Sequence, residues 1–110
     1  MSDYSGDDIY CDVIIPRRVE IDVFAETANV LAFHHTRPFW PTHIVVTPKH
    51  HITSLLELEG LLAAELFELV KQVARMVSDR EGSAQVLTNL GADQESKHLH
   101  IHVASGEKFR

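Results

Sequence analysis

The sequence is poor in the features that mark secreted or membrane proteins. Cys11 is the only cysteine in 110 residues, so no internal disulfide is possible and a reducing compartment is expected. No apolar run approaches the roughly 20 residues that a membrane span needs. The acidic N-terminus, residues 1–8, is unlike a signal or transit peptide and is predicted to be a flexible tail. We therefore expect a cytoplasmic protein that has no membrane partner.

Basic residues are also scarce, with 10 Lys and Arg against 16 Asp and Glu and a net charge of −6. Binding to a nucleic-acid backbone needs a basic face, so nucleic acid is not an expected partner. A small phosphate-containing ligand is still compatible with this charge, because the local field of a site matters more than the net charge. The length and the 45% hydrophobic content predict one compact domain over residues 9–110.

Hydrophobic periodicity predicts an α+β fold. Apolar residues recur at spacings of three or four over residues 55–77, which predicts a long helix with Gly60 near its start and Gly82 beyond its end. A short helix is predicted over residues 9–14. Strands are predicted at residues 19–23, 30–33, 44–46, 84–88 and 98–103. The long helix is expected to cover one face of the resulting sheet.

The histidines are clustered in three short stretches of the chain. They are His34, His35, His43, His50, His51, His98, His100 and His102. In the last stretch histidines alternate with apolar residues, so a strand would place three imidazoles on one face. Surface histidines rarely fall in such register, and a purification tag is usually contiguous and terminal. The pattern therefore favours a functional site.

Two kinds of site fit the alternating histidines. Three histidines can bind zinc, but these positions span about 13 Å along a strand. One ion reaches two neighbours, and a third ligand would then come from His43, His50 or His51. A phosphate ester fits the spacing better, because separate imidazoles can attack, donate to an oxygen and handle the leaving group's proton.

Residues 98–104 resemble the signature of the histidine triad (HIT) superfamily, in which histidines alternate with apolar residues. Three upstream segments, residues 9–14, 30–33 and 41–52, resemble other HIT motifs in the expected order. Gln94 and Glu95 lie where a Gln-Ser or Gln-Glu pair precedes the triad. The resemblance covers nearly the whole chain from residue 9 and is closest to the Hint branch.

The resemblance implies a five-stranded antiparallel sheet with one short and one long helix, usually in a homodimer. It also implies hydrolysis or transfer of nucleoside monophosphate groups through a nucleotidyl-histidine intermediate. Purine nucleoside phosphoramidates or mixed anhydrides are the expected substrates, and no cofactor is expected. Two alternatives stay open: a nucleotide-binding regulatory or scaffolding protein with weak or no catalysis, and a histidine-based metalloprotein.

The same resemblance assigns roles to individual residues. His100 would attack the α-phosphorus, and His102 would donate to a non-bridging oxygen. His98 and His43 would support the site and the leaving group's proton path. The expected substrate-binding residues are Asn89 near the phosphate, His35 near the ribose, Gln94 and Glu95 before the triad, and Ile9, Tyr10, Val13 and Phe33 around the base.

The chain also departs from the HIT pattern. His35 stands where Asp or Asn is usual, and a neutral histidine cannot accept a bidentate pair of hydrogen bonds. The loop before His98 is shorter than in many Hint proteins and lacks their Gly-Gly. Asp8 and Cys11 show that the Cys-x-x-Cys of some relatives is absent, so no metal is expected there.

Overall fold

The computed structural model describes residues 8–94 and 96–109 and shows an α+β fold built on one five-stranded sheet. Neighbouring strands are antiparallel and follow the order β1-β2-β3-β5-β4. The strands are β1 (Val23–Glu26), β2 (Val30–His34), β3 (Thr42–Pro48), β4 (Gln85–Leu87) and β5 (Ile101–Ser105). The predicted fold class is therefore confirmed.

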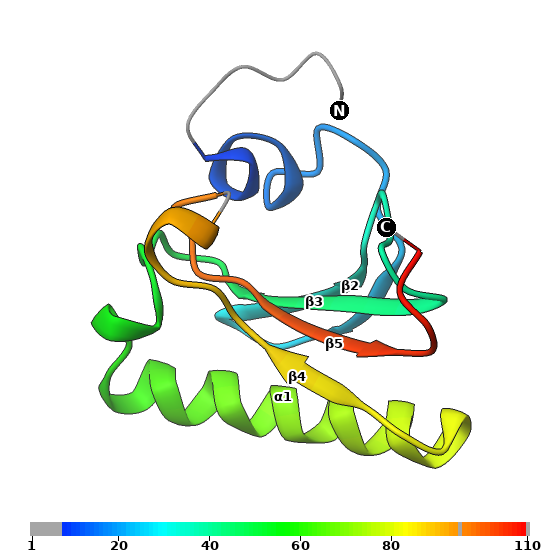
Figure 1. Ribbon diagram of the computed structural model, residues 1–110. Helices are drawn as coiled ribbons and strands as arrows, with labels where there is room; N and C mark the ends of the chain where they lie inside the picture. Colours follow the sequence, from blue (N-terminus) through cyan, green and yellow to red (C-terminus); the bar gives the residue numbers. More distant parts are fainter. Residues whose placement is uncertain (1–7, 95, 110) are drawn as a thin grey trace.

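One face of the sheet is covered by the long helix α1 (Gly60–Glu81), which runs beneath the strands in Figure 1. Its buried stripe packs against one set of alternating strand residues. These core residues are Val30, Ala32, Ile44, Val46, Leu66, Leu69, Val70, Val73, Val77, Leu99, Ile101 and Val103. The helix ends at Gly82, whose positive φ of 86° suits glycine and whose N–H donates to the Ser78 carbonyl.

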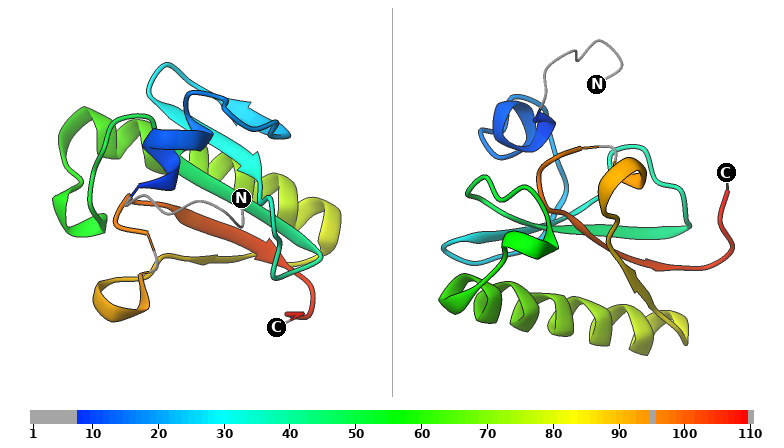
Figure 2. Two further views of the ribbon diagram at one scale, coloured as in Figure 1. Left: turned by 90° about the horizontal axis from the view of Figure 1, so that it is seen from above. Right: turned by 60° about the vertical axis from the view of Figure 1, so that its left-hand side comes forward.

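The opposite face carries a short helical segment, η1 (Tyr10–Ile14), and the right-hand view of Figure 2 shows it and α1 on either side of the sheet. η1 is one turn of π-helix, in which the N–H of Ile15 donates to the carbonyl of Tyr10. Tyr10 and Ile14 pack there against Leu31, Phe33 and Val45. Alternation along the strands thus separates an apolar core from a second face that is available for a site.

Short 3₁₀ turns complete the connections: η2 (Leu55–Glu57) leads into α1, and η3 (Gly91–Asp93) lies between β4 and β5. Two predicted strands were displaced. β1 is Val23–Glu26, not residues 19–23, because the Thr27 N–H donates to the Val30 carbonyl and this turn sets the pairing with β2. The last strand begins at Ile101, because the N–H of Leu99 donates to the Ile52 carbonyl and so is not used in the β3 ladder.

Among the described residues, no helix is both long enough and apolar enough to cross a membrane.

Candidate active site

An open cavity of about 840 Å³ lies on the face of the sheet that carries η1. Its lining comes from η1, from β2 and the loop after it, and from the chain around β4 and β5. The lining residues are Ile9, Tyr10, Ile14, Phe33, His35, Thr36, Arg37, Phe39, Trp40, Gln85, Leu87, Asn89, Asp93, Ser96, His100, His102 and Lys108. Two of the three triad imidazoles, His100 and His102, therefore face one cavity.

His100 is held in one orientation by contacts on both its ring and its backbone. Its Nδ1–H donates to the carbonyl of His98 at 2.7 Å. The hydroxyl of Thr88 donates to the carbonyl of His100 at 2.8 Å, and the Tyr10 ring stacks on the imidazole with centroids 5.0 Å apart. Because the proton sits on Nδ1, Nε2 is the basic nitrogen of this ring and the one suited to nucleophilic attack.

The proton positions on His102 and His43 follow from a chain of hydrogen bonds. The backbone N–H of Phe39 can only donate, and it lies 3.0 Å from His43 Nδ1. The proton of His43 is therefore on Nε2, which donates to His102 Nδ1 at 2.8 Å. His102 must then carry its own proton on Nε2. The chain from Phe39 thus makes His102 a hydrogen-bond donor at Nε2.

Burial keeps both of these imidazoles neutral. Burial, reinforced by the neighbouring His35 and His100, lowers the pKa of His43 to about 4. Burial, together with the neighbouring imidazoles of His100, His43 and His35, lowers the pKa of His102 to about 3. Near pH 7 both rings are therefore uncharged, which agrees with the single proton that the hydrogen-bond chain assigns to each.

His98 has a different setting from the other two histidines. Its ring is fully buried outside the cavity lining, and its Nε2–H donates to the carbonyl of Pro48 at 2.8 Å. Its Nδ1 lies 2.9 Å from Asp8 Oδ2 and 3.4 Å from Cys11 Sγ. His98 thus acts on the site through its carbonyl, which fixes the ring of His100.

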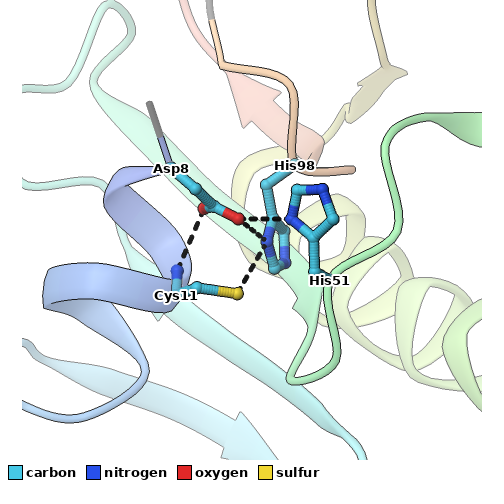
Figure 3. Close-up of side chains that lie close together, drawn as sticks. All are labelled: Asp8, Cys11, His51 and His98. Carbon is cyan, nitrogen blue, oxygen red and sulfur yellow. Dashed lines mark hydrogen bonds and ion pairs between the residues drawn. The ribbon is translucent and has the colours of Figure 1, made fainter. Parts of the chain in front are cut away.

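The carboxylate of Asp8 is ionised even though it is partly buried. Burial opposes ionisation, but hydrogen bonds from the N–H of Cys11 and from His98 and His51 hold the pKa of Asp8 well below its usual range. From the sequence, Asp8 was expected in a flexible tail, and His51 was considered only as a possible third ligand of a metal at the triad. Only the tertiary fold brings the turn that holds Asp8 and Cys11 together with His51 and His98 (Figure 3), because these three segments are far apart in the chain.

Most of the residues predicted to bind substrate lie around the cavity. Asn89, His35, Phe33, Ile9 and Tyr10 line it, but Val13 does not. Ile14 lines it instead, since the wide π-turn of η1 changes which side chains share a face.

Two predicted binding residues differ from this group. The buried side chain of Gln94 donates to the Thr53 carbonyl at 2.7 Å and does not line the cavity, so it braces the loop before the triad. Glu95 lies outside the described residues.

The structure also adds charged and aromatic residues that no sequence motif indicates. Arg37 and Lys108 line the cavity and bring positive charge to it. The Lys108 ammonium lies 5.4 Å from the centre of the Trp40 ring, and the N–H of Phe109 donates to the Phe39 carbonyl, which fixes the C-terminal segment there. No local motif marks these residues, because their position depends on how the chain end packs.

A family profile for the HIT domain matches residues 17–109. The chain belongs to the HIT family. A protein of Azospirillum brasilense described as an uncharacterized 13.2 kDa HIT-like protein is 39% identical over 90 residues, which cover 76% of this chain and 74% of that protein. An uncharacterized HIT-like protein of Chlamydia trachomatis is 34% identical over 97 residues, which cover 84% of this chain and 87% of its own.

Solved structures give the same family. A hypothetical histidine triad nucleotide-binding protein from Sulfolobus tokodaii has a TM-score of 0.80 at 32% identity, covering 88% of this chain and 67% of its own. A HIT family hydrolase from Clostridium thermocellum has a TM-score of 0.77 at 28% identity, with 94% of both chains covered. These comparisons identify the superfamily and leave the Hint-like branch as a prediction.

Proposed function

We propose that this HIT protein hydrolyses or transfers nucleoside monophosphate groups through a nucleotidyl intermediate on His100. Purine nucleoside phosphoramidates are the substrate class that we favour. The observation that carries the proposal is the set of proton positions at the cavity: a basic Nε2 on His100 lies beside a neutral donor on His102. Two structural relatives are described as a hydrolase and as a nucleotide-binding protein, and these descriptions support a nucleotide hydrolase.

The first step is a displacement at the α-phosphorus. Nε2 of His100 would form a bond to phosphorus while the phosphorus–nitrogen bond breaks, and the leaving amine would take a proton from solvent in the open cavity. The Nδ1–H of His100 stays on the carbonyl of His98, which stabilises the positive charge that develops on the ring. In the second step water displaces His100 and releases the nucleoside monophosphate.

His102 would stabilise the negative charge that develops on the phosphoryl oxygens. Its Nε2–H is a donor in place before the reaction, since His43 and the Phe39 backbone fix its orientation. A donor that is already oriented need not reorganise as the charge develops, so it stabilises the transition state more than a solvent donor would. His43 donates to His102 but does not itself line the cavity, so we assign it a positioning role.

The rest of the cavity fits a nucleotide. The side chains of Ile9, Tyr10, Ile14 and Phe33 form an apolar wall that suits a flat purine base. Arg37 and Lys108 would attract the phosphate group in an otherwise acidic protein. Asn89 lines the same cavity and would lie near the phosphate and the leaving group.

The homodimer and the cytoplasmic location also remain proposals. Exposed apolar side chains, Phe67 and Met76 on α1 and Val86 on β4, offer a surface that a second copy would cover. Equilibrium sedimentation would test the dimer, since a mass near 12.4 kDa at micromolar concentration would contradict it.

The test of the proposed function is turnover of adenosine 5′-phosphoramidate, followed by separation of the adenosine monophosphate product. We expect steady turnover by the parent protein and a loss of roughly four orders of magnitude or more in His100→Ala. Calorimetry with adenosine monophosphate should show that this variant still binds nucleotide. Tight binding by the parent without turnover would instead favour the nucleotide-binding or scaffolding alternative.

A further inference from the structure

One buried hydroxyl just before the triad has no hydrogen-bond partner. Among the described residues that are not exposed, Ser96 Oγ is the only side-chain oxygen or nitrogen that is sealed from solvent and lacks such a partner. Folded proteins rarely leave a hydroxyl in this state, because removing it from water without a replacement hydrogen bond costs stability. The location of Ser96 indicates what its hydroxyl is kept for.

Ser96 lines the cavity that also contains His100 and His102. The residue as a whole is only half-buried, although its oxygen is sealed. A serine hydroxyl has three staggered positions about the Cα–Cβ bond, so rotation about this bond can turn the oxygen of Ser96 toward the cavity. The HIT motif assigns this residue no role, since the polar pair before the triad is Gln94 and Glu95.

The segment around Ser96 is held in place by its neighbours. The ammonium group of Lys97 donates to the carbonyls of Gly91 and Gln94. The side chain of Gln94 in turn donates to the Thr53 carbonyl at 2.7 Å. These side chains brace the segment on both sides of Ser96, whose hydroxyl takes no part in the bracing. The hydroxyl is therefore fixed at the edge of the cavity and left for a ligand.

We propose that Ser96 binds the phosphate of the nucleotide by donating its hydroxyl proton to a non-bridging phosphoryl oxygen. The identity of the ligand rests on the proposed function. The α-phosphoryl group has two non-bridging oxygens, and the Nε2–H of His102 is a donor for one of them. Ser96 would hold the other oxygen and so help to present the phosphorus to Nε2 of His100. A hydrogen bond to a charged oxygen of this kind is stronger than one between neutral groups.

The other residues of the cavity favour an anionic partner for this hydroxyl. Arg37 and Lys108 bring positive charge to the lining, and His102 brings a neutral donor. Of the described residues that line the cavity, Asp93 alone is acidic. An anionic phosphoryl oxygen would therefore be attracted to this cavity. It would also give Ser96 the acceptor that the described part of the folded chain does not supply.

The test is the affinity of Ser96→Ala for adenosine monophosphate and for adenosine, measured by calorimetry. We expect the affinity for the monophosphate to fall about ten- to a hundredfold, because one hydrogen bond to a charged group is lost. The affinity for adenosine, which lacks the phosphate, should not change. The matched control is Ser83→Ala, since the Ser83 hydroxyl contacts Ser105 and does not line the cavity. It should bind both compounds as the parent does.

Thermal unfolding separates a ligand-binding hydroxyl from a structural one. Without ligand, the Tm of Ser96→Ala should equal or exceed that of the parent, because the variant removes a buried hydroxyl that has no partner. At one fixed concentration of adenosine monophosphate, the rise in Tm should be smaller for Ser96→Ala than for the parent or for Ser83→Ala. A structural hydroxyl would give the opposite pattern: a lower Tm without ligand and an unchanged rise with it.

Three results would overturn the proposal. One is equal affinity of Ser96→Ala and the parent for adenosine monophosphate, which would assign the hydroxyl to a bound water. Another is an equal loss of affinity for the monophosphate and for adenosine, which would place Ser96 away from the phosphate. The third is a lower Tm of Ser96→Ala without ligand.

Failure of this proposal can be told apart from failure of the proposed function. If the parent turns over adenosine 5′-phosphoramidate while Ser96→Ala binds the monophosphate as tightly as the parent, only the role of Ser96 is wrong. If the parent binds the monophosphate but turns nothing over, the proposed function is wrong, and the affinities still decide the role of Ser96. A parent that binds no adenosine monophosphate would contradict both.

Discussion

The two outer histidines of the triad are each two residues from His100, yet their surroundings differ sharply. His98 is sealed from solvent and faces a carboxylate, a thiol and His51. His102 lines the cavity, and its Nδ1 accepts a hydrogen bond from the neutral ring of His43. One setting removes the ring from the cavity, and the other keeps an imidazole uncharged as a donor.

The alternating motif therefore does not make His98, His100 and His102 equivalent. The segments packed over each ring decide its hydrogen-bond partners and its proton position. η1 and the Pro48–His51 loop cover the His98 end, whereas the loop containing Phe39 covers the His102 end. The following predictions test that division of roles.

The largest effect should come from His102→Ala. Loss of one preorganised donor to the phosphoryl oxygens should lower kcat by about 10²–10³-fold, with a much smaller change in KM. Steady-state kinetics with adenosine 5′-phosphoramidate measure this, with His50→Asn as the unaffected control. An unchanged kcat in His102→Ala would contradict the donor role that the structure assigns to this ring.

The next effect is on the pH dependence of stability. The pKa values of about 4 for His43 and about 3 for His102 lie below the ordinary 6.5, so between pH 6.5 and about 4 the unfolded chain binds protons that the folded chain does not. The free energy of unfolding should therefore fall as the pH falls through this window. From about pH 6.5 to about pH 5 the loss should reach about 2–4 kcal/mol.

Urea unfolding at several pH values measures this dependence. His102→Asn removes one of the two titrating groups, so its stability should decline less steeply than that of the parent over the same window. Equal slopes for the two proteins would show that His102 does not stay neutral in the folded state.

His43→Phe should have an intermediate effect. Loss of the Nε2–H donor leaves the buried Nδ1 of His102 unsatisfied, which costs about 1–3 kcal/mol and would lower kcat roughly ten- to a hundredfold. His43→Gln should restore part of the rate, because its amide can donate to the same nitrogen. If Gln and Phe reduce kcat equally, His43 does not act by orienting His102.

The smallest effect concerns His35, whose Nδ1 accepts from the N–H of Arg37 at 2.9 Å and whose proton is therefore on Nε2. A ring that presents a donor to the ribose should discriminate weakly between adenosine and 2′-deoxyadenosine substrates. His35→Asp supplies a charged acceptor and should raise the ribose preference by about fivefold, from a difference of about 1 kcal/mol. The ratio of kcat/KM values measures it, and an unchanged ratio would place His35 away from the sugar.

Local patterns predicted the parts of the molecule that depend on local periodicity. The apolar stripe of α1 and the alternation of His100, Ile101 and His102 follow from local spacing alone, and both are present in the structure. The ends of β1 and β5 were wrong, since pairing with β2 and β3 decides where these strands begin. Long-range contacts of that kind leave no local signal.

The lack of a local signal for long-range contacts also explains which residues near the site the sequence did not reveal. The resemblance to the HIT family selected His100 and His102 by their spacing. The convergence of Asp8, Cys11 and His51 on His98 requires the fold, because the chain between Cys11 and His51 contributes three strands before it returns. Ile14 replaced Val13 at the cavity because periodicity for an α-helix does not describe a π-turn.

The most direct test of the account is the identity of the residue that carries the nucleotide. The parent protein is mixed briefly with adenosine 5′-phosphoramidate, quenched with denaturant at alkaline pH and digested for mass spectrometry. We predict an adenylyl group on His100 that forms within the first turnover and is absent from His100→Ala. Product release with no protein adduct, or an adduct on another histidine, would contradict the account.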